Sequence, residues 1–152
     1  MSVTQLSQNP VFSKVVVDLD GTLLDTADPH VAAVPGMIEL IEELAAAGVG
    51  VAVLSTRPDV ASLLAARGIR LGQVEVVVAE HAADGLRAAA ATLGPAAGAM
   101  VFVADRGTDV AAGANAGVPT VLVEWGYGSP DEALGAHAVV HSSDQLRAVL
   151  LG

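Results

Sequence analysis

With 152 residues, the chain has the usual length of one domain, and we expect residues 1–152 to form a single domain in which residues 1 to about 12 are a candidate flexible segment. A formal net charge of −10 opposes binding to nucleic acid and to anionic membranes, so neither is an expected partner. Because the chain has no cysteine, no signal-peptide pattern at its start and no apolar stretch long and unbroken enough to span a bilayer, we expect a cytoplasmic protein.

Valine-rich runs alternate with segments of helical periodicity, an order typical of parallel strands connected by helices. Strands are predicted at KVVVD (14–18), GVAVLS (50–55), VEVVVA (74–79), MVFVAD (100–105), PTVLVE (119–124) and AVVH (138–141). Helices are predicted between Pro35 and Gly48, and over 58–67, 82–93, 108–116 and 143–151, the last with Ser143 as its N-cap. The runs are apolar on both faces, which predicts an α/β fold: a doubly wound (Rossmann-like) parallel sheet of five to six strands with helices on both faces.

The first predicted strand runs directly into two aspartates, Asp18 and Asp20, followed by Gly21. In parallel sheets of this kind, ligands bind at the carboxyl ends of the strands. Two neighbouring carboxylates raise each other's pKa unless a cation lies between them. The pair therefore indicates either a metal site or a shared proton at this edge of the sheet.

A second acidic pair follows the fourth predicted strand. Asp105 ends that strand, and Asp109 lies four residues later at the start of a helix, so both side chains can face the same crevice. Oxygen ligands from Asp18 and Asp105 suit Mg²⁺. An aspartate at a helix start can also simply stabilise the helix dipole, but beside Asp18 and Asp20 we favour a metal site.

Two stretches of the sequence resemble a known family. DLDGTLLDT (18–26) resembles the first motif of the haloacid dehalogenase (HAD) superfamily, particularly its phosphoglycolate-phosphatase-like branch, and ADRGTDVAAGANAGVPTVLVEWGYGSPDEA (104–133) resembles a later part of that branch. The resemblance implies a Mg²⁺-dependent phosphate monoester hydrolase. It implies that Asp18 is the nucleophile that forms an aspartyl phosphate, and that Asp20 is the acid and base. It also implies a metal site built from Asp18, the backbone carbonyl of Asp20, Asp105 and Asp109.

The second predicted strand ends in hydroxyl-bearing residues. Ser55 resembles the family's second motif, in which a hydroxyl binds a phosphate oxygen, and Thr56 takes that role if the register differs by one residue. Arg57 follows as a further phosphate-binding candidate. The alternative is a hydroxyl that only caps the turn before Arg57 and Pro58.

One family feature is missing, because the branch has a lysine after the third strand and here Glu80 occupies that position. The only lysine, Lys14, precedes Asp18 by about 13 Å of extended strand, at the opposite end of the sheet. Arg57 and Arg106 are the cations expected to reach the site, although a planar guanidinium differs from a compact ammonium. Losing one preorganised stabilising group costs about 3 kcal/mol, which predicts slow turnover.

The cap of that branch is also missing, since only ADPHVAAV (27–34) separates Thr26 from Pro35. Caps exclude water and select small substrates, so we expect a capless, open site that admits a phosphorylated small molecule or protein. An open site in an alanine-rich chain is also compatible with a homo-oligomer. Trp125 and Tyr127 either line the mouth of the site or pack on the sheet edge.

Two functions follow from these features. The first is a HAD-type phosphatase with low activity. The alternative is a HAD-like domain that keeps the metal and phosphate pocket but has a binding or assembly role with little or no turnover. The four aspartates favour the first function, and Glu80 together with the missing lysine favours the second.

Overall fold

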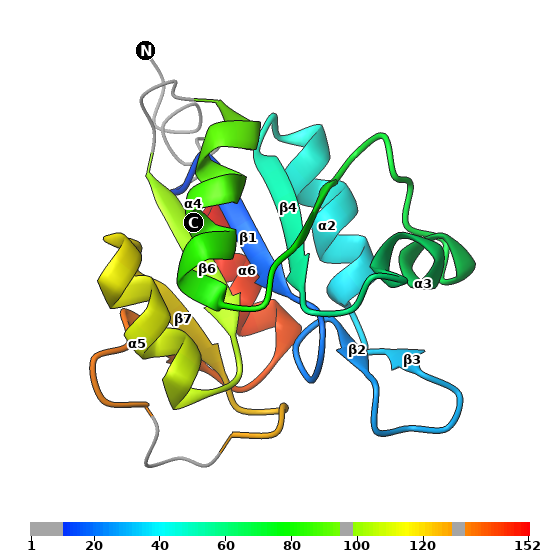
Figure 1. The fold of residues 1–152 in the computed structure, drawn as a ribbon. Helices are drawn as coiled ribbons and strands as arrows, with labels where there is room; N and C mark the ends of the chain where they lie inside the picture. The colour runs from blue at the N-terminus through cyan, green and yellow to red at the C-terminus, as the bar shows by residue number, and fades with distance from the viewer. Residues whose placement is uncertain (1–10, 95–98, 129–132) are drawn as a thin grey trace.

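The computed structural model describes residues 11–94, 99–128 and 133–152, and there it confirms the predicted α/β fold (Figure 1). A six-stranded sheet has the order β5-β4-β1-β6-β7-β8, with parallel neighbours throughout. Its strands are β1 (Lys14–Asp18), β4 (Gly50–Ser55), β5 (Glu75–Val78), β6 (Met100–Ala104), β7 (Thr120–Val123) and β8 (Ala138–Val140). The predicted flexible segment falls almost entirely outside the described residues.

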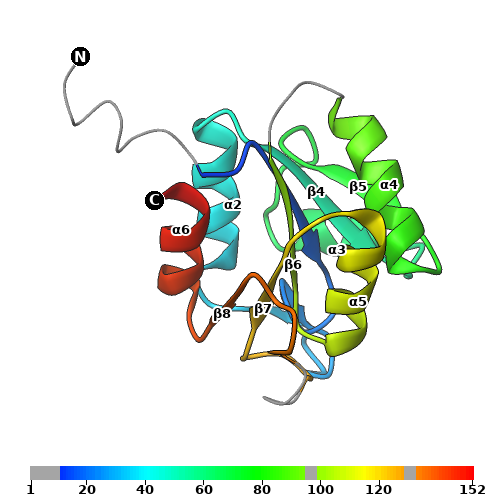
Figure 2. The same cartoon turned by 90° about the vertical axis from the view of Figure 1, so that its left-hand side faces the viewer.

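Helices cover both faces of the sheet (Figure 2). On one face, α2 (Met37–Ala46), α3 (Val60–Ala66) and α6 (Ser143–Leu151) share an apolar cluster with the strands. On the other face, α4 (Ala82–Leu93) packs against β4 and β5, and α5 (Gly107–Ala116) packs against α4 and β7. Within the described residues, no helix combines the length and apolarity that a membrane span requires.

The direction of side chains along β1 decides which face carries the site. Val15 and Val17 belong to the cluster under α2 and α6, whereas Val16 belongs to the cluster under α4. Since alternate residues of a strand share a face, Asp18 at the end of β1 lies on the side of α4 and α5. At the opposite end of the strand, the Lys14 ammonium donates a hydrogen bond to the carbonyl of Gly94, so it does not serve the carboxyl edge.

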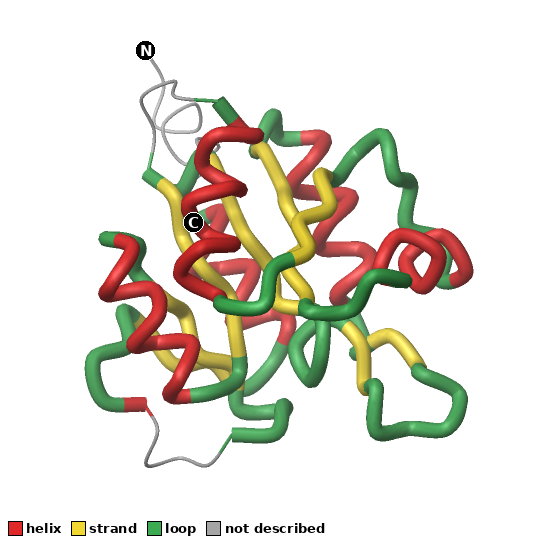
Figure 3. The backbone as a smooth tube through the Cα atoms, in the orientation of Figure 1, coloured by secondary structure: helices red, strands yellow, loops and turns green. Residues whose placement is uncertain are grey.

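A small hairpin that the sequence analysis did not predict follows β1. Its strands β2 (Leu24–Asp25) and β3 (Ala32–Ala33) pair antiparallel and are joined by residues 26–31. Figure 3 shows this pair set apart from the main sheet, beyond its carboxyl edge. The amide of Val34 donates to the carbonyl of Leu23 at 2.9 Å, which closes the base of the hairpin.

The predicted cap of the last helix is wrong by one residue. The N-cap of α6 is Ser142, whose extended backbone precedes the helix and whose hydroxyl accepts a hydrogen bond from the amide of Gln145 at 3.2 Å. Ser143 already lies in the first turn. Both residues are serine, so composition alone does not distinguish the cap from its neighbour.

Gly113 of α5 lies where a side chain does not fit, because a Cβ there would lie 2.3 Å from the Thr120 hydroxyl oxygen and 2.7 Å from the Val118 carbonyl oxygen. Alanine is favoured over glycine within a helix by about 1 kcal/mol. We nevertheless expect Gly113→Ala to lower the free energy of unfolding by about 1–3 kcal/mol, since the backbone must shift. Urea unfolding measures this change.

Gly72→Ala is the matched control for this experiment, because a Cβ at Gly72 would have no neighbouring atom within 4 Å. We expect the control to unfold close to the wild type. If Gly113→Ala is as stable as Gly72→Ala, the close approach of α5 to the segment before β7 is wrong.

Candidate active site

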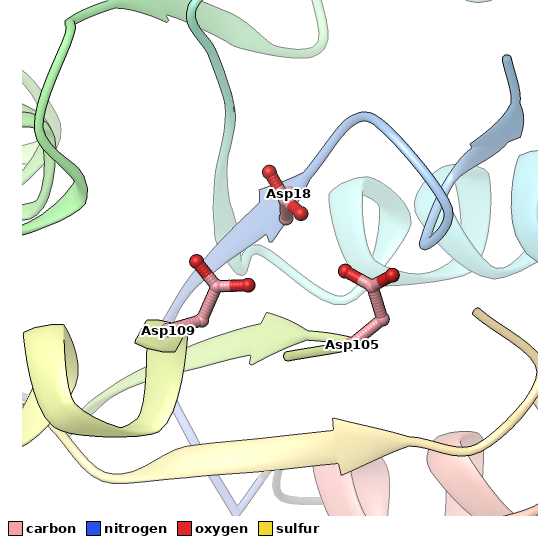
Figure 4. A group of neighbouring side chains, drawn as sticks. All are labelled: Asp18, Asp105 and Asp109. Atoms are coloured by element: carbon pink, nitrogen blue, oxygen red, sulfur yellow. The ribbon is translucent and has the colours of Figure 1, made fainter. Parts of the chain in front are cut away.

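Three carboxylates converge at the carboxyl edge of the sheet. Asp18 ends β1, Asp105 follows β6 directly, and Asp109 lies in the first turn of α5. One carboxylate oxygen from each lies within 4.8 Å of those of the other two. Figure 4 shows the three side chains pointing toward a common space. The structure therefore brings together three of the four aspartate side chains that the sequence analysis selected.

Two loops hold Asp105 in a fixed position. Its buried carboxylate accepts a hydrogen bond from the amide of Tyr127 at 2.7 Å and a longer one from the Thr22 hydroxyl at 3.4 Å. A Cβ on Gly21 would lie 2.5 Å from Oδ2 of Asp105, and a Cβ on Gly126 would lie 2.3 Å from its Cβ. Only glycine allows both loops to approach the carboxylate this closely.

The three carboxylates do not all carry a negative charge without a cation. Burial, and then the neighbouring charges of Asp109, Asp105 and Asp20, raise the pKa of Asp18 from 3.8 to about 9, with a further contribution from a hydrogen bond to Asp105. A divalent cation between the oxygens would reverse this shift. The donors are carboxylate oxygens in a compact group, which fits the ligand preference of Mg²⁺.

Ser55 and Thr56 line a pocket of about 470 Å³ together with Asp18 and Asp109. Ser55 ends β4 and is buried, and its hydroxyl oxygen accepts a hydrogen bond from the amide of Arg57 at 3.0 Å. The two predicted phosphate-binding hydroxyls and the predicted nucleophile therefore share one cavity. Both Ser55 and Thr56 face it, so both alternatives stay open.

Asp20 and Arg57 lie at the border of this site. A guanidinium nitrogen of Arg57 lies 3.9 Å from a carboxylate oxygen of Asp20, and both side chains are about one-third exposed to solvent. The same guanidinium donates to Asp59 at 3.2 and 3.3 Å, which is the shorter interaction. Arg57 is therefore oriented mainly by Asp59, and its second neighbour is Asp20.

The cations expected at the site do not line the 470 Å³ pocket. Neither Arg57 nor Arg106, the N-cap residue of α5, is among the described residues that line it. Glu80 does line it, as does His81, which is the only basic side chain in that lining. The sequence analysis missed His81, although its position directly after Glu80, at the predicted helix start, was a usable signal.

Trp125 and Tyr127 belong to the loop after β7 and tie it to the segment after β1. The indole nitrogen of Trp125 donates to the carbonyl of Thr22 at 2.9 Å, and the indole packs against the core. The hydroxyl of Tyr127 donates to a carboxylate oxygen of Asp25 at 2.9 Å. Both aromatic residues also line a second pocket, so they pack on the sheet edge and border a cavity at once.

Comparisons with known proteins find HAD-like relatives. A family model described as HAD-hydrolase-like matches residues 81–149. The chain is 32% identical over 127 residues to the tyrosine-protein kinase PtkA of Mycobacterium tuberculosis, covering 76% of this chain and 44% of that protein. It is 36% identical over 114 residues to a phosphoglycolate phosphatase of Rhodospirillum rubrum, covering 69% and 47%. The chain thus spans about half the length of these curated relatives.

Solved structures show the same fold. A predicted phosphatase from Clostridium acetobutylicum superposes with a TM-score of 0.78 at 19% identity, covering 91% of this chain and 97% of that one. At this identity the likeness concerns the fold alone. The arrangement of strands and helices around the three carboxylates is therefore a known one.

The raised pKa of Asp18 predicts how pH changes the stability of the metal-free protein. From about pH 3.8 to about 9, the folded chain keeps a proton on Asp18 that the unfolded chain releases. The folded state therefore binds more protons, and its stability falls as the pH rises through this window. Urea unfolding in EDTA should show a steeper fall for the wild type than for Asp18→Asn, which carries no titrating group there. Parallel profiles would contradict the raised pKa.

Proposed function

Because the chain belongs to the haloacid dehalogenase superfamily and is similar to its phosphatases, we propose that it is a Mg²⁺-dependent phosphate monoester hydrolase. The proposed reaction passes through an aspartyl phosphate on Asp18. The observation that carries the proposal is the shared cavity of Asp18, Asp109 and Ser55 beside the buried Asp105. A nucleophile, a set of metal ligands and a phosphate-binding hydroxyl are the parts that this reaction needs.

In the first step, a carboxylate oxygen of Asp18 attacks phosphorus, and the bond from phosphorus to the ester oxygen breaks. Asp20 gives its proton to the leaving alkoxide, which departs as the alcohol. In the second step, Asp20 takes a proton from water, and the resulting hydroxide attacks phosphorus and releases inorganic phosphate from Asp18.

The side chains of Asp18, Asp105 and Asp109 would hold the Mg²⁺ ion, with the backbone carbonyl of Asp20 as the ligand that the family resemblance implies. When bound, the ion offsets the charge of the carboxylates and of the phosphate, so that Asp18 is ionised at neutral pH. Ser55, or Thr56 beside it, donates to a phosphate oxygen. The amide of Tyr127 and the hydroxyl of Thr22 keep Asp105 oriented toward this space.

The proposed substrate is a phosphorylated small molecule or a protein, and the proposed location is the cytoplasm. The short connection of residues 26–31 between β2 and β3 supports a capless, open site. We propose no nucleic-acid or membrane partner, because the net charge of −10 would repel both. A homo-oligomer remains part of the proposal, since a second copy could cover an open site.

A second candidate function is phosphate and metal binding with little turnover. The observation that favours it is Glu80 in the lining of the pocket, where its carboxylate repels a phosphate dianion. His81 is the only basic side chain in the described lining. A missing preorganised cation costs about 3 kcal/mol, or roughly a hundredfold in rate, so we expect slow hydrolysis rather than none.

Phosphate release from a generic aryl phosphate and a panel of sugar and glycolate phosphates tests the enzyme. We expect slow release that depends on Mg²⁺, disappears in EDTA and falls at least about a hundredfold in Asp18→Asn, because the nucleophile is lost. Asp144→Asn changes an exposed aspartate in the first turn of α6 and should retain the wild-type rate. Equal rates for the wild type and Asp18→Asn across the panel would contradict hydrolysis.

Thermal melts separate binding from turnover. Beryllofluoride mimics the phosphoryl group, so Mg²⁺ with beryllofluoride should raise the melting temperature of the wild type more than that of Asp18→Asn. Such a shift without phosphate release would favour the binding role. An equal shift in both proteins would mean that the described pocket is not the phosphoryl site.

A further inference from the structure

The pocket of about 470 Å³ that contains Asp18 continues past the carboxylate cluster as a crevice between α4 and α5. One wall consists of residues 79–83, which follow β5 and begin α4. The other wall is one side of α5 between Thr108 and Asn115. Figure 2 shows the two helices next to each other on one face of the sheet. A metal ion and a phosphate group fill only part of this volume, so the same cavity has room for a leaving group.

Two contacts fix the position of Glu80 in the first wall. The amide of Ala79, the residue before it, donates a hydrogen bond to the carbonyl of Ser55 at 3.0 Å. A Cβ on Gly85, in the first turn of α4, would lie 2.3 Å from the Cδ1 methyl group of Leu54, so the start of this helix packs directly on the end of β4. Glu80 lies between these two contacts in the chain, and therefore beside the strand end that carries the predicted phosphate-binding hydroxyl.

Among the described residues, the carboxylate of Glu80 has no cationic partner. Asp18 and Asp109 belong to the cluster that would share the Mg²⁺ ion, but Glu80 does not. The salt bridges of the described residues include neither Glu80 nor His81, which is the one basic side chain in the described lining. With the metal bound, Glu80 is therefore the remaining acidic side chain of this lining whose charge nothing offsets.

The charge of Glu80 determines which leaving groups are favoured in this crevice. A carboxylate here repels the phosphate group, and a leaving group that carries a second anion, as in phosphoglycolate, adds to the repulsion. A leaving group that carries an ammonium group instead can pair with Glu80 through charge-assisted hydrogen bonds. With two carbons between the ester oxygen and the nitrogen, the leaving group is flexible enough for its ammonium group to lie between the Glu80 carboxylate and a phosphate oxygen.

The rest of the lining favours a primary ammonium group over a quaternary one. Proteins bind quaternary ammonium groups on the faces of aromatic rings, and the described lining contains no phenylalanine, tyrosine or tryptophan. A primary ammonium group instead brings three N–H donors for a carboxylate. We propose that the substrate is a phosphate monoester of a small primary amino alcohol, such as 2-aminoethyl phosphate, and that Glu80 binds its ammonium group. The substrate thereby supplies the positive charge that the chain lacks at this position.

This inference rests on the proposed hydrolase function, and a matched pair of esters tests it. 2-Aminoethyl phosphate and propyl phosphate differ only by an ammonium group in place of a methyl group. With Mg²⁺ present, we expect the kcat/KM of the wild type to be about tenfold higher for 2-aminoethyl phosphate. Choline phosphate should gain less, since its quaternary nitrogen donates no hydrogen bond. Equal values for 2-aminoethyl phosphate and propyl phosphate, or a preference for choline phosphate over both, would overturn the inference.

Variants at position 80 show whether Glu80 causes the preference. Glu80→Gln keeps the size of this exposed side chain and removes its charge, so the ratio of kcat/KM for the two esters should fall to about one. Glu80→Lys reverses the charge and should favour propyl phosphate. Glu42→Gln removes the same charge from an exposed position of α2, on the opposite face of the sheet, and should keep the wild-type ratio. A wild-type ratio in Glu80→Gln would overturn the inference.

Binding without turnover separates this inference from the hydrolase. 3-Aminopropylphosphonate and butylphosphonate copy the two esters with a carbon in place of the ester oxygen, so they resist hydrolysis. In calorimetric titrations with Mg²⁺ present, the wild type should bind 3-aminopropylphosphonate about tenfold more tightly, and Glu80→Gln should bind both alike. This preference without turnover of any ester would overturn the hydrolase and support the ammonium site. Turnover of both esters at equal rates, with equal phosphonate affinities, would support the hydrolase and overturn the ammonium site.

Discussion

The mutual repulsion of three carboxylates is the constraint on which the rest of this structure depends. Asp18, Asp105 and Asp109 bring their oxygens within 4.8 Å of one another, and the pKa of Asp18 rises to about 9 as a result of burial and its neighbours. Bringing three carboxylates together does not by itself stabilise the folded chain. A divalent cation would resolve the conflict, and in the proposed hydrolase it would also keep the carboxylate of Asp18 ionised for attack on phosphorus.

The fold maintains this arrangement through rigid elements and close backbone approach. The strands β1 and β6 are central and buried, so they fix the Cα positions of Asp18 and Asp105, while α5 supplies Asp109. Two glycines allow the loops after β1 and β7 to close on Asp105. Tyr127 then connects this end of the site to the hairpin, because its amide donates a hydrogen bond to Asp105 and its hydroxyl donates one to Asp25. The carboxylate cluster and the hairpin are thus linked by hydrogen bonds to one residue.

The sequence predicted the features that depend on strand order and failed at those that depend on local detail. Aspartates after two apolar strands were expected to meet because parallel strands end at the same edge, and they do. The hairpin was not predicted, since strands of two residues leave no periodic pattern. Nor does spacing reveal that Arg57 bonds mainly to Asp59, because that depends on side-chain direction in a loop.

Calorimetric titration with Mg²⁺ measures the cation site without requiring turnover or a substrate. We expect one ion per chain for the wild type, at least about tenfold weaker binding for Asp105→Asn, and wild-type binding for Asp144→Asn, an exposed aspartate on α6. Asp105→Asn preserves the size of the buried side chain, so a melting curve verifies its fold. Wild-type affinity in Asp105→Asn would contradict the claim that these carboxylates form the metal site.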